Sequence, residues 1–98
     1  MKDFETMQSS AEEAARLLKV LANPNRLMTV CMLLEAELSV GQLNQELPLS
    51  QSALSQHLAV LREEGLVATR KEAQVVYYRL AKPEVKKILA VLYELYCQ

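Results

Sequence analysis

The segment Leu49–Leu66, LSQSALSQHLAVLREEGL, decides how this chain is interpreted. At 3.6 residues per turn, Leu54, Leu58 and Leu61 fall on one stripe of a helix. The opposite side carries small or polar side chains, namely Ser52, Ser55, Gln56, Ala59 and Glu63. Ser and Gln donate and accept hydrogen bonds, and a small Ala lets the backbone approach base edges, so this pattern is typical of a helix that enters the major groove of DNA. The alternative that this segment alone leaves open is an ordinary amphipathic helix with a polar surface.

The charges of the chain are unevenly distributed. The net charge of the 98 residues is −1, but residues 1–49 carry four basic and seven acidic side chains, residues 50–82 carry five and three, and residues 83–98 carry two of each. The positive excess therefore coincides with the candidate reading helix. Because so few charges are involved, counterion release from one subunit gives modest affinity, which favours two subunits side by side. A 51% apolar composition in so short a chain also favours a homodimer.

The N-terminal segment, the apolar stretches and the cysteines indicate in which cellular compartment the protein resides. The opening MKDFETMQSS lacks the apolar core of a secretory signal, and no apolar stretch is long enough for a membrane span, so we expect a cytoplasmic protein. The two cysteines, Cys31 and Cys97, are too few and too far apart for a disulfide-built fold or a paired zinc site. We expect one domain over residues 1–98, with residues 1–8 as a flexible N-terminal arm.

Capping residues mark where helices begin. Each candidate start has a Ser or Asn, and three of them also have a following Pro or a Glu or Gln three residues later. These signals predict helices that begin after Ser10, Asn23, Ser39 and Ser50. The first runs to about Ala22, the third ends near Pro48, and Gly65 ends the reading helix. The third and fourth helices, joined by a short turn, form a helix-turn-helix.

After Gly65 the apolar period changes from helical to alternating. The segments LVATRKE and VVYYRL are predicted strands of a hairpin, joined near residues 72–74. Three cations, Arg70, Lys71 and Arg79, are expected on or near its tip, where they suit phosphate or minor-groove contact. This segment alone also allows a solvated hairpin that happens to be basic.

A last helix completes the predicted fold. Pro83 opens it, and its wide apolar face consists of Val85, Ile88, Leu89, Leu92, Leu95 and Tyr96. Within so small a chain, this face can pack only against the first helix and a second subunit. The predicted fold is therefore mainly α with a small β-hairpin wing: a winged helix-turn-helix of five helices that dimerises through its first and last helices.

The segments that carry a resemblance are ELSVGQL, LSQSALSQHL, GLVATR, RKEAQ, YYRL and the terminal LYCQ. In this order they resemble the ArsR/SmtB family of winged-helix repressors over roughly residues 10 to 97, and within it the HlyU-like branch, which is related to the reactive-sulfur sensors SqrR and BigR. The resemblance implies a homodimer that places two reading helices in successive major grooves of an inverted-repeat operator.

Many members of this family sense metals, and the residues needed for that role are missing here. Ser39 and Gly41 stand where thiol-using members carry cysteines, and the last helix offers Glu84 and Glu94 but no histidine. We therefore expect no metal and no cofactor. His57, the single histidine, lies at the edge of the apolar seam, where packing or a phosphate contact is expected. Since no histidine is paired with a thiol or hydroxyl and no phosphate-cradling glycine loop is present, we expect no enzymatic activity.

The two cysteines lead to different expectations from spacing and from the resemblance. By spacing alone, Cys31 lies on an apolar stripe with Leu27 and Leu34 and is expected to be buried and inert, whereas Cys97 is near the mobile C-terminus. In the HlyU-like and sulfide-responsive proteins that this chain resembles, a second-helix and a last-helix cysteine act together as a switch. Both positions match here, so the resemblance implies that oxidation or persulfidation of the Cys31 and Cys97 pair controls DNA affinity. A direct disulfide requires Cα atoms within about 7 Å.

The predicted DNA contacts fall into two groups. In the groove we expect Gln51, Ser52, Ser55, Gln56 and His57, and toward the backbone Arg62, Arg70, Lys71 and Arg79. The leading hypothesis is a dimeric, sequence-specific transcriptional regulator with a reactive-sulfur or oxidant inducer. One alternative is an unswitched regulator that relieves silencing or activates by competing with other DNA-bound proteins. Another is a protein-interaction module whose apolar last helix recruits a partner, although the polar reading face and the basic wing argue against it.

Overall fold

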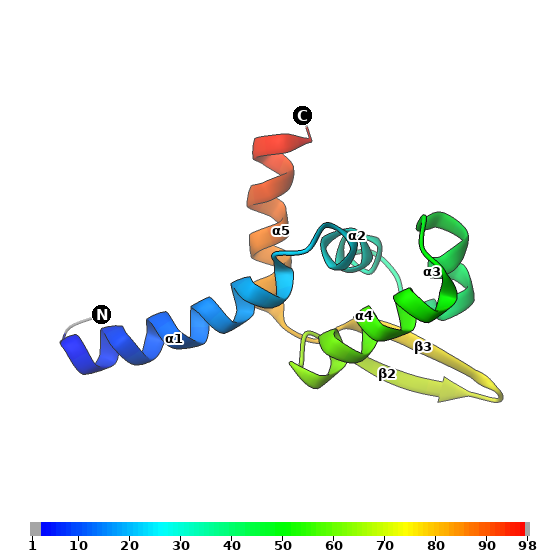
Figure 1. Cartoon of the computed structure of the whole chain (residues 1–98), viewed down its shortest axis with the longest axis horizontal. Coiled ribbons are helices and arrows are strands. Elements are labelled where there is room, and N and C mark those ends of the chain that lie inside the picture. Colours follow the sequence, from blue (N-terminus) through cyan, green and yellow to red (C-terminus); the bar gives the residue numbers. More distant parts are fainter. Residues whose placement is uncertain (1–2, 98) are drawn as a thin grey trace.

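The chain folds as a winged helix-turn-helix, as predicted (Figure 1). In the computed structural model, which describes residues 3–97, five helices and three strands follow one another along the chain. They are α1 (Phe4–Leu21), α2 (Pro24–Met32), β1 (Leu38–Ser39), α3 (Val40–Glu46), α4 (Gln51–Glu63), β2 (Val67–Glu72), β3 (Val75–Leu80) and α5 (Pro83–Tyr96). Helices α3 and α4 form the helix-turn-helix, and β2 and β3 form the wing.

The predicted caps of three helices are confirmed. The Asn23 side chain accepts hydrogen bonds from the backbone N–H groups of Asn25 and Arg26 at the start of α2. Ser39 and Gln42 form both halves of a capping box at α3, and Ser50 accepts from the Ala53 N–H at α4. Because these bonds join residues two or three positions apart, local sequence was enough to locate them.

The predicted start of the first helix is wrong. Helix α1 begins at Phe4, where the Asp3 carboxylate accepts a 2.7 Å hydrogen bond from the Thr6 N–H, and this bond lowers the pKa of Asp3. Ser10 lies exposed inside the helix. Residues 4–9 contain no proline or glycine that would end a helix, so the earlier cap prevails. From Phe4 onward the expected arm is helical, while residues 1–2 lie outside the described part of the chain.

The wing belongs to a three-stranded sheet and is more than a hairpin. The short strand β1 pairs with β3, with Leu38 opposite Tyr78, and gives the strand order β1-β3-β2. Strands β2 and β3 pair in register from Val67 opposite Leu80 to Glu72 opposite Val75. The turn between them places Ala73 in the left-handed region, with φ 55°. β1 thus joins the middle of β3 to the start of α3.

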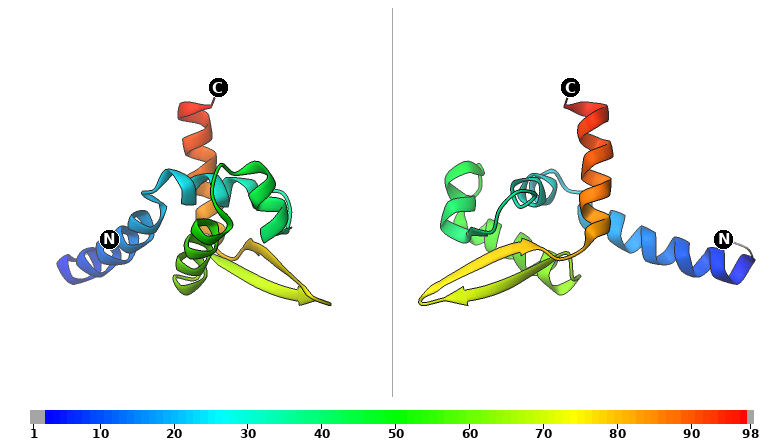
Figure 2. Two further views of the ribbon diagram at one scale, coloured as in Figure 1. Left: turned by 45° about the vertical axis from the view of Figure 1, so that its right-hand side comes forward. Right: turned by 180° about the vertical axis from the view of Figure 1, so that it is seen from behind.

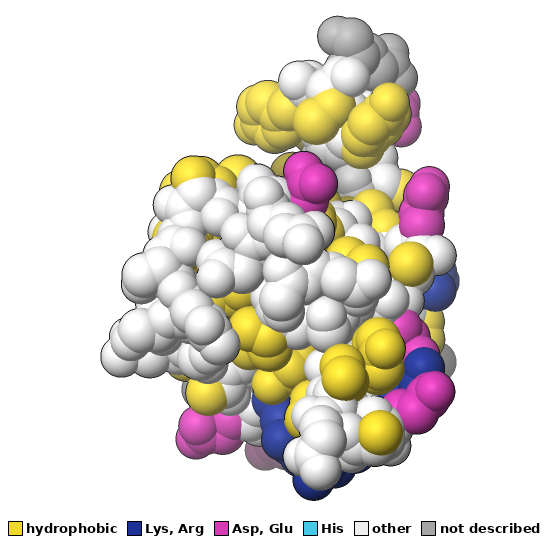
Figure 3. Space-filling model, turned by 90° about the vertical axis from the view of Figure 1, so that its right-hand side faces the viewer, with side chains coloured by type: hydrophobic (Ala, Val, Ile, Leu, Met, Phe, Trp, Pro, Cys, Tyr) yellow, Lys and Arg dark blue, Asp and Glu magenta, His cyan; other side chains and the backbone are white. Residues whose placement is uncertain are grey.

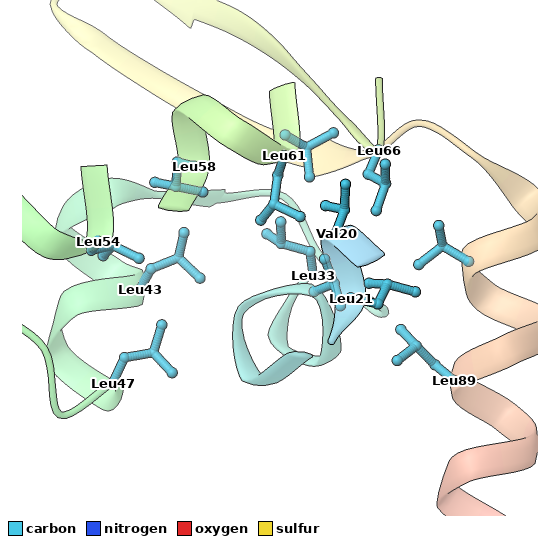
Figure 4. Packing of buried hydrophobic residues seen from close by; sticks show 13 residues of the cluster. Val20, Leu21, Leu33, Leu43, Leu47, Leu54, Leu58, Leu61, Leu66 and Leu89 are labelled. Atoms are coloured by element: carbon cyan, nitrogen blue, oxygen red, sulfur yellow. The ribbon is translucent and has the colours of Figure 1, made fainter. Parts of the chain in front are cut away.

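A single buried cluster positions the reading helix (Figure 4). Leu54, Leu58 and Leu61 of α4 are at most 1% exposed, which confirms the predicted apolar stripe. They pack with residues from the other helices and from the start of the wing: Val20, Leu21, Val30, Leu33, Leu43, Leu47, Leu66, Val67, Val85 and Leu89. Gly65, with φ 78°, ends α4 in the left-handed conformation that glycine adopts readily. The opposite side of α4 consequently faces outward.

Two helices extend away from this core. In Figures 1 and 2, α1 projects from one end of the body and α5 stands clear of it over its C-terminal half. The Cα radius of gyration is 14.8 Å, compared with about 13 Å for a compact domain of this length. None of the helices that the structure describes combines the length and apolarity needed to cross a membrane.

Candidate DNA-binding face and cysteine groove

The outer side of α4 is a continuous polar surface. Gln51, Ser52, Ser55 and Gln56 are exposed, and so is Ala59. Each lies on the side of α4 opposite to, or flanking, the buried leucine stripe, so the helix can enter a groove without exposing its core. Arg62 is exposed in the last turn of the same helix. Four of the five predicted groove-reading residues, Gln51, Ser52, Ser55 and Gln56, are therefore gathered on one surface, which we call the reading face.

The wing arginines are held by acidic side chains. Arg70 Nε lies 2.6 Å from Glu37 Oε1, and its Nη1 lies 2.6 Å from Glu72 Oε2. The guanidinium also stacks over the Tyr77 ring, 4.7 Å from its centroid. The hydrogen bonds to Glu72 and Glu37 raise the pKa of Arg70, which stays charged. On the face shown in Figure 3, Lys and Arg side chains at the lower edge lie beside acidic ones.

The three wing cations are not equivalent. Arg79 lies opposite Ala68 near the base of the wing, not near its tip, and its Nη1 is 3.9 Å from Glu37 Oε2. Lys71 lies opposite Val76, close to the turn. Within residues 3–97, neither Lys71 nor Arg62 forms an ion pair. Sequence reasoning missed Glu37 because it precedes Arg70 by 33 positions and meets it only through the pairing of β1 with β3.

His57 lies half-buried at the margin of the reading face. Its Nδ1 is 3.5 Å from Nη1 of Arg26 on α2. The same guanidinium donates through Nε to the Val20 carbonyl oxygen at 2.6 Å. Arg26, a residue of α2, therefore contacts α1 through Val20 and α4 through His57.

Both cysteines line one apolar groove between α2 and α5. The groove has a volume of about 560 Å³, and its walls are Leu27, Cys31, Leu34, Leu89, Leu92, Tyr93, Tyr96 and Cys97. Cys31 is exposed, so the burial expected from spacing is wrong. The apolar stripe of α2 that contains Cys31 does face α5, but α2 and α5 leave an open groove beside Cys31. Cys31 and Cys97, the two cysteines that the resemblance pairs, therefore line the same groove.

The surroundings of Cys31 disfavour its thiolate. Although Cys31 is exposed in the groove, partial desolvation by the surrounding side chains raises the pKa of its thiol, and the neighbouring Cys97 sulfur raises it further. Among the described residues, no cation contributes an opposing effect on this thiol. A raised pKa lowers the fraction of Cys31 that is present as the nucleophilic thiolate at neutral pH. Within residues 3–97, no group of three or more His, Cys, Asp or Glu side chains is placed to hold a metal ion.

Residues 23–69, from the cap of α2 into β2, match the family described as "Bacterial regulatory protein, arsR family". The chain is also 55% identical to the transcriptional activator HlyU of Vibrio cholerae, over 98% of this chain and 89% of that protein. The chain belongs to the ArsR family. Like the ArsR-family proteins it matches, it is a DNA-binding transcriptional regulator, and those relatives are regulators and not enzymes.

Solved ArsR-family structures share the fold over nearly the whole chain. Reduced HlyU from V. cholerae superposes with a TM-score of 0.91 and 56% identity, covering 97% of this chain and 100% of that one. The transcriptional repressor BigR from Xylella fastidiosa gives 0.89 and 45%, covering 96% of each chain. The homodimeric winged helix-turn-helix domain of Mb0332 from Mycobacterium bovis gives 0.81 and 26%, covering 96% and 87%.

Proposed function

We propose that this regulator binds an inverted-repeat operator as a homodimer, and that its DNA affinity falls when Cys31 and Cys97 become linked. The observation that carries the proposal is that both thiols line one groove between α2 and α5, the helix we assign to the dimer interface, while the reading face lies on α4, which contributes no residue to that groove. Effector chemistry and DNA binding thus occupy separate surfaces of one small core.

Exposed apolar side chains on α1 and α5 support the homodimer. Phe4 and Leu18 on α1 are 68% and 54% exposed, and Leu95 and Tyr96 on α5 are 67% and 79% exposed. Large apolar side chains gathered on two projecting helices are typical of an interface. The solved winged helix-turn-helix DNA-binding domain from M. bovis is homodimeric. A second copy of this chain would cover both helices.

The reading face supports direct recognition of bases. Gln51, Ser52, Ser55 and Gln56 would hydrogen-bond to base edges in the major groove. Arg62 and Lys71 would contact phosphates first, because they form no ion pairs within the described residues. Arg70 and Arg79 would contact phosphate in competition with Glu37, and Arg70 also with Glu72. We expect no metal, cofactor or catalytic step in this function.

The switch requires an electrophilic sulfur compound, for which an organic trisulfide serves as the example. The Cys31 thiolate attacks its central sulfur and forms Cys31–S–S–SR′ as RS⁻ leaves. The Cys97 thiolate then attacks that same transferred sulfur, and R′S⁻ leaves. The product is a Cys31–S–S–S–Cys97 bridge. Two thiolates are oxidised, two RS⁻ groups are released, and the protons of the cysteine thiols pass to solvent or to those groups. An organic disulfide gives a direct Cys31–Cys97 disulfide by two analogous displacements.

Such a bridge would tie the end of α5 to α2. Helix α2 packs into the same core as α4, and α5 is the proposed dimer helix. Constraining one against the other would alter the separation of the two reading faces, and successive major grooves accept one separation only. One of the solved relatives was determined as the reduced protein, which is consistent with redox state being a variable in that protein.

The test measures DNA affinity before and after bridging. DNA fragments selected from the host genome with the reduced protein are titrated with wild type, Cys31→Ser and Cys97→Ser, each reduced or treated with an organic trisulfide. We expect at least a tenfold loss of affinity, about 1.4 kcal/mol, in treated wild type only. Mass spectrometry verifies the bridge.

Two other outcomes are informative. Full affinity in wild type with a verified bridge would contradict the switch and favour the unswitched regulator that competes with other DNA-bound proteins. Absence of salt-dependent binding to any duplex would contradict the DNA-binding role of the reading face and favour the protein-interaction module.

A further inference from the structure

The junction of α1 and α2 leaves a carbonyl group that the helix cannot pair by itself. In a continuous helix the Val20 carbonyl would accept from the N–H of residue 24, but that residue is Pro24, which has none. Arg26 Nε occupies this role and donates to the Val20 oxygen at 2.6 Å. The Arg26 backbone N–H is in turn held by Asn23 Oδ1 at 3.1 Å. The Arg26 residue is therefore held at both ends, at its backbone N–H by Asn23 and at its guanidinium by the Val20 carbonyl oxygen.

An anchored guanidinium points its remaining N–H groups in fixed directions. Nη1 of Arg26 meets Nδ1 of His57 at 3.5 Å. A guanidinium only donates, so a hydrogen bond at this contact requires a lone pair on Nδ1 and the ring proton on Nε2. With this tautomer, Arg26 would hold the His57 ring in one orientation.

We propose that Arg26 is a positioning residue for DNA binding, which holds His57 so that its Nε2–H can donate to a DNA phosphate. This inference rests on the proposed DNA-binding role of α4. His57 is half-buried at the margin of α4, next to the exposed Gln56, and Nε2 has no hydrogen-bond partner among the described residues. The margins of a reading helix are the parts that lie beside the phosphate backbone. Arg26 acts through the ring and does not itself touch DNA.

The first measurement needs no DNA. Since His57 is the only histidine, a long-range ¹H–¹⁵N spectrum of the labelled chain reports its two ring nitrogens without ambiguity. We expect the reduced wild type at pH 8 to show the proton on Nε2 and Nδ1 at the shift of a nitrogen that accepts a hydrogen bond. In Arg26→Met, Nδ1 moves to the shift of a free ring nitrogen, and Arg26→Lys restores it in part. A wild-type spectrum with the proton on Nδ1 would overturn the proposal whether or not any variant folds.

The second measurement uses a random-sequence duplex of roughly 30 base pairs at low salt, because a phosphate contact does not depend on sequence. Arg26→Met and His57→Phe should each weaken binding by roughly tenfold, the size of one lost hydrogen bond to a charged group. The double variant should lose no more than either single variant. Arg16→Met, which removes an exposed cation from α1, is the matched control and should change affinity by less than about twofold.

Three further results would contradict the inference. One is an additive loss in the double variant, and another is an unchanged Nδ1 shift in folded Arg26→Met. A wild type that binds no duplex would overturn the DNA-binding role of α4 and with it the phosphate contact. In that case the ring spectrum still decides whether Arg26 fixes His57, so the two failures are distinguishable.

Discussion

The reading face and the cysteine groove are built in opposite ways. The reading face lies on one 13-residue helix, where local spacing alone separates polar from buried positions. The groove joins residues from α2 and its C-terminal end to residues from α5, and its two thiols, at positions 31 and 97, are far apart in the sequence. One surface is polar over a fully buried stripe, and the other is apolar and open. Helical spacing therefore determines which side of a helix is apolar. The exposure of a residue on that side, such as Cys31, depends on how far the neighbouring helix covers it.

The largest expected effect separates the two sides of α4. Leu58 is 1% exposed, so Leu58→Ala removes buried contacts and leaves a cavity that should lower the free energy of unfolding by about 3 kcal/mol. Ser55→Ala on the exposed side should change it by less than about 0.5 kcal/mol. Urea denaturation of both variants measures the difference. Equal effects would mean that the two sides of α4 are not distinguished by burial.

The next largest effect distinguishes base reading from phosphate contact. Gln56→Ala should reduce discrimination between selected and random DNA by about 1–3 kcal/mol, without changing the salt dependence. Lys71→Ala should weaken binding to both DNAs alike and lower the salt slope by about one. Fluorescence anisotropy over a salt series measures both quantities. If the two variants behaved alike, the roles assigned to α4 and to the wing would be wrong.

A smaller effect concerns the charge available on the wing. Glu37→Gln should release Arg79, leave Arg70 paired with Glu72 alone, and raise affinity for random DNA about two- to fivefold, with a steeper salt dependence, because exposed ion pairs contribute about 0.2–1 kcal/mol. Glu35→Gln removes the same charge from an exposed neighbour that forms no ion pair within residues 3–97. Identical gains in both variants would show that net charge alone, and not the Glu37 contacts, sets the affinity.

The smallest expected effect lies in the groove. Because burial and Cys97 both raise the pKa of Cys31, the rate of its alkylation by neutral iodoacetamide should keep rising with pH above the ordinary range for a thiol. Cys97→Ser removes the smaller of these contributions and should move the rate profile to lower pH. Peptide mass spectrometry follows Cys31 selectively. An unchanged profile would show that the two sulfurs do not interact in solution.

Local signals explain what could be predicted from the sequence. The caps at Asn23, Ser39 and Ser50 and the leucine stripe of α4 involve residues a few positions apart, and the structure confirms them. The start of α1 was misplaced because a capping-box pattern at Ser10 also fits inside a helix. Strand β1 could not be predicted because a strand of two residues is too short to show an alternating apolar pattern. Only its pairing with β3 defines it.

The candidate site divides in the same way. The outward-facing residues of α4 follow from its period, whereas Glu37, Arg26 and the open groove at Cys31 depend on contacts between distant segments. No local pattern marks an acidic residue as the partner of an arginine on the wing. The resemblance to the HlyU-like branch, and not spacing, pointed to the cysteine pair.

The most direct test of the account is a hydroxyl-radical footprint of the reduced protein on a selected genomic fragment. Two reading faces in one dimer should protect two patches about 10–10.5 base pairs apart, and both should disappear together after the Cys31–Cys97 bridge forms. A single protected patch, or two patches that persist unchanged in fully bridged protein, would contradict it.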